Sequence, residues 1–265
     1  MKIAILLTDV DDSEFSRSFP NDAEKFRRLL QQSRPDWHFV TYPVKDNIFP
    51  AQVDAYDGYL ITGSPASVHD DLPWIARLFD LIREAHALRL PMVGACFGHQ
   101  AIATALGGRV ARNDKGWGLG ATTTTFTHHA HWMRQAHESI RLYCAHNEQV
   151  VELPTGAVVI GHDPIAPVSA FILGDHILAT QHHPEMTPDY VAGLLDYMAP
   201  DLEPGVLEAA RRAIAGGAQG HMFAGWIVDF YEAASASRQG TRVVEHDNHA
   251  ASNDAIAGKG RLRAA

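Results

Sequence analysis

The chain has 265 residues, of which 46% are hydrophobic and 20% charged, a composition typical of a globular protein that can bury a full core. Its 31 acidic residues outnumber its 22 basic residues, and the resulting formal net charge of −9 argues against nucleic-acid binding as the main function. The first apolar run, Met1–Thr8, meets Asp9 too soon to be a membrane span or a signal segment. We therefore expect small-molecule chemistry, without a nucleic-acid or membrane partner.

Cysteine usage indicates the compartment. The chain contains 2 cysteines, Cys96 and Cys144, too few for a disulfide framework, and this predicts a reducing, cytoplasmic location. Cys144 lies in the apolar-flanked run Leu142–Ala145, which is typical of a residue packed in a core.

Short apolar runs alternate with amphipathic segments in the first part of the chain. The pattern predicts strands at Lys2–Leu7, His38–Tyr42, Gly58–Thr62 and Pro91–Ala95, and helices at Asp22–Gln32, Pro73–Ala87 and just after Cys96. Such alternation predicts an α/β fold with a mostly parallel open sheet and helices on both faces. Ligands of this fold class bind at the carboxyl ends of the strands.

The pattern changes after Gly107-Gly108 to alternating, threonine-rich segments. These predict a small antiparallel addition, with strands near Ala121–Thr127, Leu142–Ala145, Ala157–Ile160, Ala170–Leu173 and Ile177–Gln181. Helices are expected again at Thr187–Met198, Val206–Ile214 and Met222–Ala234. We predict one domain over residues 1–234 and a polar, disordered tail over residues 235–265.

Cys96 lies where a buried strand turns into a helix, within Gly94-Ala95-Cys96-Phe97-Gly98. A sharp turn of this kind strains its central residue, while the flanking glycines allow close backbone approach. The following helix directs its N-terminus at the sulfur, which favours the thiolate. Because cysteines are often simply buried, the turn identifies a nucleophile only if a base is also present.

The predicted strand Ile177–Gln181 ends in His182-His183-Pro184-Glu185, which offers such a base. His183 can take up and deliver protons, and Glu185 can hold its other ring nitrogen. His182 is a rival base, but it points to the opposite face of the strand from its neighbour. A second histidine group, His128, His129 and His131, lacks a metal-ligand pattern, so we interpret it as solvated surface and predict no metal site.

Together, the turn at Cys96 and the downstream His183-Pro184-Glu185 resemble the class I glutamine amidotransferase family, in particular stand-alone members similar to the glutaminase domain of GMP synthase. The segment Gly63-Ser64-Pro65 is similar to the strand-end loop of the family, which normally reads Gly-Gly-Pro or Gly-Ser-Pro. The resemblance covers roughly Met1–Met198 and implies a flavodoxin-like amidotransferase fold. It also implies a triad of Cys96, His183 and Glu185.

The resemblance further implies roles for other residues. The backbone N–H groups of Ser64 and Phe97 would form the oxyanion hole. Gly63, Gln100, His146 and Gln149 would contact the glutamyl group of the substrate. The segment Lys115–Gly120 resembles a glycine-rich stretch of stand-alone members, and we interpret it as a turn with a packed Trp117, with a functional role as the lesser alternative.

The implied reaction is attack by Cys96 on the side-chain amide of glutamine, or on another γ-glutamyl amide, to form a γ-glutamyl thioester, with no cofactor. A member of this family normally passes its ammonia to a synthase, but the sequence shows no phosphate-binding loop and no second α/β unit that could form one. The synthase is therefore expected to be separate or absent. Two enzyme functions follow: a self-sufficient γ-glutamyl hydrolase, and a glutaminase subunit that supplies ammonia to a separate synthase. A third alternative is an inactive binding or regulatory module of the same fold.

Overall fold

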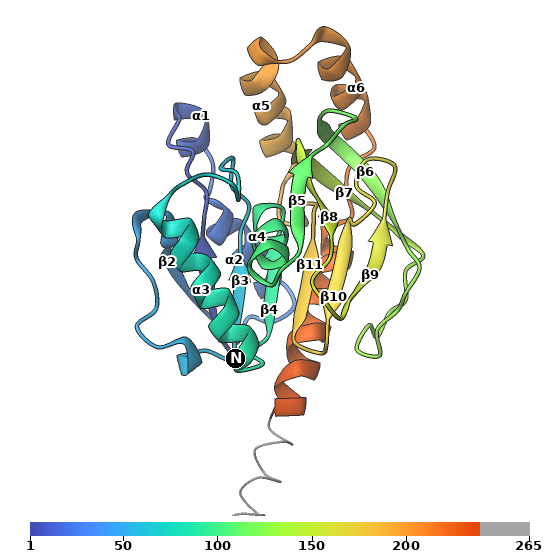
Figure 1. The fold of residues 1–265 in the computed structure, drawn as a ribbon. Helices are drawn as coiled ribbons and strands as arrows, with labels where there is room; N and C mark the ends of the chain where they lie inside the picture. The colour runs from blue at the N-terminus through green and yellow to red at the C-terminus, as the bar shows by residue number, and fades with distance from the viewer. Residues whose placement is uncertain (239–265) are drawn as a thin grey trace, which may run out of the picture.

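A nine-stranded mixed sheet forms the centre of the described residues, 1–238, in this computed structural model (Figure 1). The strand order is β2-β1-β3-β4-β11-β10-β9-β6-β7. Neighbouring strands are parallel from β2 to β11 and antiparallel from β11 to β7. The predicted α/β fold with a parallel sheet is therefore confirmed, and its antiparallel addition continues the same sheet.

The strands of the parallel half are β1 (Lys2–Leu7), β2 (His38–Pro43), β3 (Gly58–Ile61), β4 (Met92–Ala95) and β11 (Ile177–Thr180). The antiparallel half contains β6 (Gly118–Phe126), β7 (Ser139–His146), β9 (Ala157–His162) and β10 (Ala170–Leu173). A separate two-stranded sheet, which the sequence pattern did not predict, pairs β5 (Arg109–Arg112) with β8 (Glu148–Glu152).

The helices are α1 (Glu14–Arg17), α2 (Asp22–Gln31), α3 (Pro73–Ala87), α4 (Phe97–Ala105), α5 (Pro188–Met198), α6 (Pro204–Ile214) and a final helix over 220–238. Short 3-10 turns occur at Val44–Asp46, Val53–Ala55 and Ala199–Asp201. None of the helices in residues 1–238 combines the length and apolar character needed to cross a membrane.

Alternation along the central strands divides the core into two layers. In β1, Ile3 and Ile5 face a layer formed with α2 and the helix over 220–238, whereas Ala4 and Leu6 face a layer formed with α3 and α4. Helices thus cover both faces of the sheet, as the sequence predicted, and Figure 1 shows α3 and α4 in front of it.

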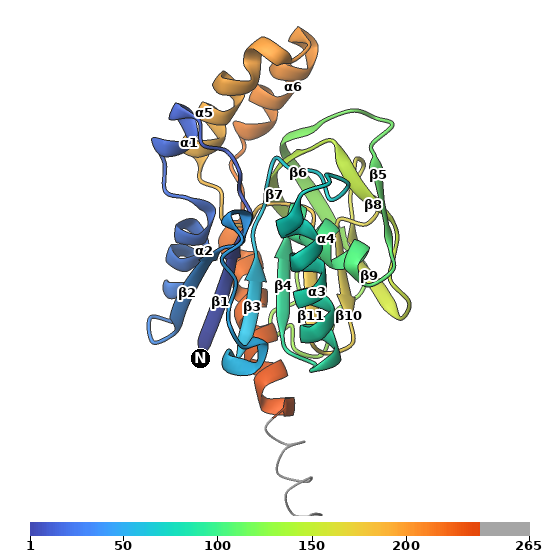
Figure 2. The same cartoon turned by 60° about the vertical axis from the view of Figure 1, so that its left-hand side comes forward.

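The helices α5 and α6 extend beyond the sheet, at the end where the parallel strands finish (Figure 2). Thr187 caps α5 by accepting a hydrogen bond from the Tyr190 N–H at 3.3 Å, and Pro188 occupies the first helical position. The chain therefore turns into a new helix directly after the His183-Pro184-Glu185 segment.

The boundary predicted at Ala234 lies inside the last helix, which continues to residue 238. The Tyr231 hydroxyl donates to the Tyr59 carbonyl of β3 at 2.6 Å and Ala234 is also buried, so the packed face of the helix reaches the predicted boundary. The rest of the predicted tail, residues 239–265, lies outside the described residues.

Candidate active site

Cys96 occupies the turn between β4 and α4 with φ 51° and ψ −105°. This φ is one that L-residues rarely adopt, so the predicted backbone strain at Cys96 is confirmed. A Cβ on Gly94 would lie 2.6 Å from the carbonyl of Gly98, and a Cβ on Gly98 would lie 2.4 Å from the carbonyl oxygen of Ile61. Both flanking glycines are thus required for the close approach of β3, β4 and α4.

Neighbouring strands bring Cys96 close to the His183 segment. β4 and β11 are parallel, with Ala95 opposite Thr180, and the Cys96 N–H donates to the Thr180 carbonyl at 2.9 Å. Since both strands end at the same edge of the sheet, the residues that follow them meet there.

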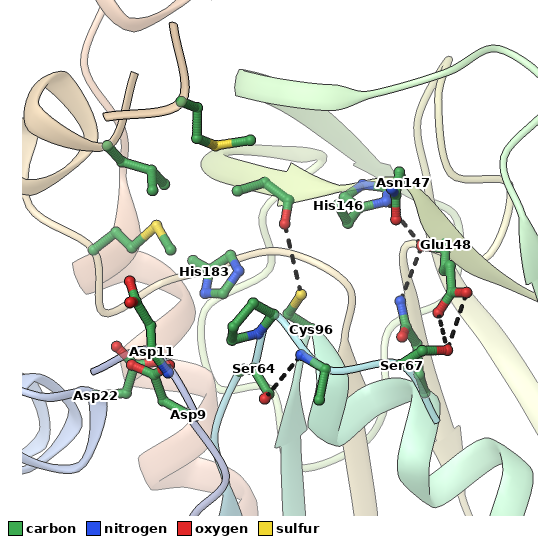
Figure 3. A pocket seen from close by; sticks show the side chains of 18 of the residues that line it. Asp9, Asp11, Asp22, Ser64, Ser67, Cys96, His146, Asn147, Glu148 and His183 are labelled. Atoms are coloured by element: carbon green, nitrogen blue, oxygen red, sulfur yellow. Dashed lines mark hydrogen bonds between the residues drawn. The ribbon is translucent and has the colours of Figure 1, made fainter. Parts of the chain in front are cut away.

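A cavity of about 500 Å³ opens at this edge, and Cys96 and His183 both line it. Figure 3 shows Asp9, Asp11 and Asp22 on one side of Cys96, and His146, Asn147 and Glu148 on the other. The remaining lining residues are Gly63, Ser64, Pro65, Ala66, Ser67, Asp70, Gln100, Trp117, Ala145, Met186, Tyr190, Leu194, Tyr197 and Met198. The volume is sufficient for a small-molecule substrate.

His183 and Glu185 form a buried pair, with 2.6 Å between Nδ1 and Oε1. The His183 N–H donates to the Tyr143 carbonyl of β7 at 2.9 Å, which holds the segment against the antiparallel half of the sheet. Burial alone would lower the pKa of His183, but the charges of Glu185 and Cys96, with hydrogen bonds to both side chains, raise it well above its ordinary value. The surroundings of His183 thus favour a protonated imidazolium beside Cys96.

His182 points away from this pair, as the alternation along the strand predicted. Its Nε2 lies 2.5 Å from Oδ2 of Asp163, and both side chains are fully buried. Burial is the largest effect and tends to raise the pKa of Asp163, but the hydrogen bond and charge interaction with His182, together with the backbone N–H groups of Ala166 and Ile165, lower it. Because His182 does not line the cavity, it is poorly placed to act as a base for Cys96.

Two backbone N–H groups, those of Ser64 and Phe97, were expected to form an oxyanion hole. Within residues 1–238 neither donates a hydrogen bond to another protein group. The loop is held in place because the Thr8 hydroxyl donates to the Gly63 carbonyl at 2.8 Å. Among the described residues, the non-glycine residues with a positive φ angle are Asn47, Arg89 and Cys96. Ser64 has no positive φ, so a serine at this position adds no backbone strain.

The structure brings together most of the residues expected to contact substrate. Gly63, Gln100 and His146 line the cavity, whereas Gln149 is buried and is not among the lining residues. The expectation that Trp117 is packed is wrong: its side chain is 37% exposed, because the turn before β6 borders the cavity rather than the core.

The acidic side of the cavity was not predicted from the sequence. Asp9 and Asp11 follow the carboxyl end of β1, a position that could have identified them, and Asp22 begins α2. Burial, together with the charge of Asp22, raises the pKa of Asp9 to about 6. Tyr190 and Tyr197 of α5 also line the cavity.

A metal site would need several ligating side chains close together. Among residues 1–238, no group of three or more His, Cys, Asp or Glu side chains could hold a metal ion. His128, His129 and His131 are exposed in the segment between β6 and β7.

Comparison with known proteins identifies the family. The model of the family "Glutamine amidotransferase class-I" matches residues 25–191. The chain belongs to this family. The match includes the turn at Cys96 and the His183 to Glu185 segment.

The relatives of this chain carry different names. The chain is 30% identical to gamma-glutamyl peptidase 4 of Arabidopsis thaliana over 200 residues, which cover 72% of this chain and 79% of the relative. It is 31% identical to one subunit of the glutamine-hydrolyzing GMP synthase of Sulfolobus acidocaldarius over 136 residues, covering 51% of this chain and 70% of that protein. A solved glutamine amidotransferase from Thermotoga maritima shares the fold, with a TM-score of 0.70, 17% identity, and coverage of 87% of this chain and 98% of the other.

Proposed function

We propose that this amidotransferase-family protein hydrolyses the amide bond of γ-glutamyl compounds, with Cys96 as nucleophile, His183 as acid and base, and Glu185 as the residue that orients His183. The observation that carries the proposal is the arrangement at one edge of the sheet. A strained cysteine at a helix N-terminus shares a cavity of about 500 Å³ with a histidine that is paired to a buried carboxylate.

The first step is attack of the Cys96 thiolate on the carbonyl carbon of the γ-amide. The C–S bond forms as the carbonyl electron pair moves to oxygen, and the resulting oxyanion needs hydrogen-bond donors. The N–H groups of Ser64 and Phe97 are suited to this role, because no other protein group occupies them within residues 1–238.

Collapse of this intermediate breaks the C–N bond. The His183 imidazolium donates its proton to the leaving amine or ammonia, leaving a γ-glutamyl thioester on Cys96. Neutral His183 then removes a proton from water, which attacks the thioester. Glutamate leaves, the thiolate is restored, and the proton remains on His183. Glu185 keeps one ring nitrogen engaged, so that the other can face the reaction.

The first candidate substrate class is γ-glutamyl amides or peptides, hydrolysed without a partner. Similarity to gamma-glutamyl peptidase 4 over 79% of that protein supports it. The cavity is bordered by Met186, Leu194 and Tyr197 as well as by polar groups, which leaves room for a leaving amine larger than ammonia.

The second candidate is glutamine hydrolysis that supplies ammonia to a separate synthase. Similarity to one subunit of a glutamine-hydrolyzing GMP synthase favours this alternative. In that case the partner would receive ammonia from the same cavity, and the Cys96 chemistry would be unchanged.

One assay separates the two candidates. The purified chain is incubated with glutamine and, separately, with a panel of γ-glutamyl amides and dipeptides, and the release of glutamate and amine is measured. Partner-free turnover of a substituted γ-glutamyl amide supports the hydrolase, whereas turnover restricted to glutamine supports the ammonia-supplying role. Absence of turnover and of thioester formation with every compound would overturn both.

The proposed nucleophile requires a reducing environment. Cys96 and Cys144 are both free thiols, and Cys96 must stay reduced to attack an amide. Cytosolic glutathione and thioredoxin maintain this state. We therefore propose that the protein acts in the cytoplasm.

A further inference from the structure

A chain of side-chain amides lies behind Cys96, outside the proposed triad. Gln100 of α4 donates from Nε2 to the main-chain carbonyl of Glu148 at 2.9 Å and contacts Oε1 of Gln181 at 3.2 Å. Nε2 of Gln181 in turn lies 3.7 Å from Sγ of Cys96, within hydrogen-bond range for sulfur. Three hydrogen bonds therefore connect a backbone carbonyl to the reacting sulfur.

The carbonyl of Glu148 determines the direction of this chain. A main-chain carbonyl can only accept, so Gln100 must present its NH₂ group to Glu148. The second proton of that NH₂ group is then available to Gln181, which must offer its oxygen. The amide of Gln181 is consequently oriented with its NH₂ group toward Cys96, and the opposite orientation would break the bond to Gln100.

Gln181 has little freedom to leave this orientation. Its side chain is fully buried directly after β11, and its N–H donates to the Ser169 carbonyl at 2.8 Å. An N–H donor held against sulfur stabilises the thiolate more than the thiol, because a hydrogen bond to a charged group is the stronger one.

We propose that Gln181 holds Cys96 in its reactive thiolate form by donating an amide hydrogen bond to Sγ, and that the Glu148 carbonyl and Gln100 fix the polarity of this bond. The inference rests on the proposed function in taking Cys96 as the nucleophile. It adds a positioning residue that lies outside the triad of Cys96, His183 and Glu185.

Two titratable side chains interact with Cys96 besides this amide. His183 contributes a hydrogen bond and, when protonated, an opposite charge, with Glu185 behind it. Cys144 of β7 interacts electrostatically with Cys96, but burial raises its own pKa far above the ordinary value of a thiol, so it stays neutral. The amide of Gln181 is uncharged and acts at every pH, which distinguishes its contribution from that of His183.

The test is the pH dependence of Cys96 alkylation by iodoacetamide, followed by peptide mass spectrometry, which separates Cys96 from Cys144. Gln181→Met removes the donor with an unbranched apolar side chain. Gln181→Glu keeps an oxygen for Gln100 but presents a second oxygen, and a negative charge, to the sulfur. The matched control is Gln219→Glu, because Gln219 accepts from the Arg141 N–H through Oε1 and does not line the cavity.

The apparent pKa of the Cys96 thiol should rise by about one unit in Gln181→Met, with an alkylation rate about tenfold lower at neutral pH. The rise should be larger in Gln181→Glu and absent in Gln219→Glu. Folded variants with a wild-type pH profile, even with a lower melting temperature, would overturn the inference, because packing alone changes stability and not thiol acidity.

A second test uses NMR on the wild-type protein, so its result does not depend on whether a variant folds. The side-chain ¹⁵N–¹H resonances of Gln181 are followed while Cys96 is alkylated. Alkylation removes the thiolate acceptor, so one amide proton of Gln181 should shift upfield, and an unchanged resonance would contradict the bond. The first test measures the reactivity of the Cys96 sulfur and the second measures the amide resonances of Gln181. Neither needs a γ-glutamyl substrate, so failure of γ-glutamyl hydrolysis would overturn the proposed function without affecting either result.

Discussion

Two groups of cysteine, histidine and carboxylate side chains meet beyond the end of β11, where His182 belongs to one group and His183 to the other, and only the His183 group reaches the cavity. His183 pairs with Glu185 at 2.6 Å, and His182 pairs with Asp163 at 2.5 Å. The first pair has Cys96 beside it and the cavity in front of it, whereas the charge of Asp163 contributes to the raised pKa of the buried Cys144. A close histidine–carboxylate pair is therefore not diagnostic by itself. Access to a cavity and a cysteine at a helix N-terminus make the difference.

The largest expected difference between the two groups is at the cysteines. Cys96→Ala should lower glutamate release from a γ-glutamyl substrate by at least about 10³-fold, because no other nucleophile is available to form the thioester. Cys144→Ala should keep kcat/KM within about twofold, since Cys144 is buried away from the cavity. Steady-state kinetics of the two variants test this, and comparable losses in both would contradict the assignment.

Substitution of His183 should lower activity, whereas substitution of His182 should lower stability. His183→Ala should reduce kcat by about 10² to 10⁴-fold through loss of proton transfer. His182→Ala leaves the buried Asp163 carboxylate without its histidine and should lower the free energy of unfolding by about 3 kcal/mol. Urea unfolding and kinetics on both variants measure the two effects, and a reversed pattern would exchange the roles of the two pairs.

Glu185→Gln should lower the pKa of His183, because the carboxylate charge is one of the effects that raise it. In the wild type, protonated His183 stabilises the fold fully below its unfolded pKa of about 6.5, and this contribution is lost as the pH rises through the higher folded pKa. The difference in unfolding free energy between wild type and variant should therefore shrink with rising pH. Histidine ring NMR and unfolding at several pH values provide the measurements; an unshifted His183 resonance would exclude the pairing.

The smallest effect is expected from a change that moves His183 without removing it. A Cβ on Gly63 would lie 2.8 Å from Cε1 of His183, so Gly63→Ala should displace the ring and lower kcat/KM by about tenfold. Gly225→Ala is the matched control, because its Cβ would meet no atom within 4 Å and it lies in the helix over 220–238. The control should keep full activity and gain about 0.5 to 1 kcal/mol of stability.

The parallel half of the fold and the core of the site were readable from sequence because local patterns carry them. Lys2–Leu7 and Pro73–Ala87 have the boundaries that the sequence pattern predicts, since the first is a short apolar run buried on both faces and the second buries one apolar stripe. Cys96 and His183 follow strands that proved to be neighbours, so a rule about strand ends was sufficient to bring them together.

Features set by distant contacts were not readable. The pairing of β5 with β8 joins two short segments without an alternating apolar face, and the exposure of Trp117 depends on where its turn lies relative to α5 and α6. The amide orientation of Gln181 depends on a carbonyl of another strand. No local pattern encodes such partners.

The adjacency of β4 and β11 has a consequence for how this scaffold can be altered. Backbone hydrogen bonds between these strands set the separation of Cys96 and His183, although the chain takes a long excursion between them. Residues 107–176 supply His146, Asn147 and Glu148 to the cavity wall, and within them Tyr143 of β7 also anchors the His183 N–H. Insertions or exchanges in the loops of this excursion that leave β7 intact should therefore change which molecules enter while the reacting groups keep their spacing, making these loops the natural segments to diversify when new amide specificities are selected.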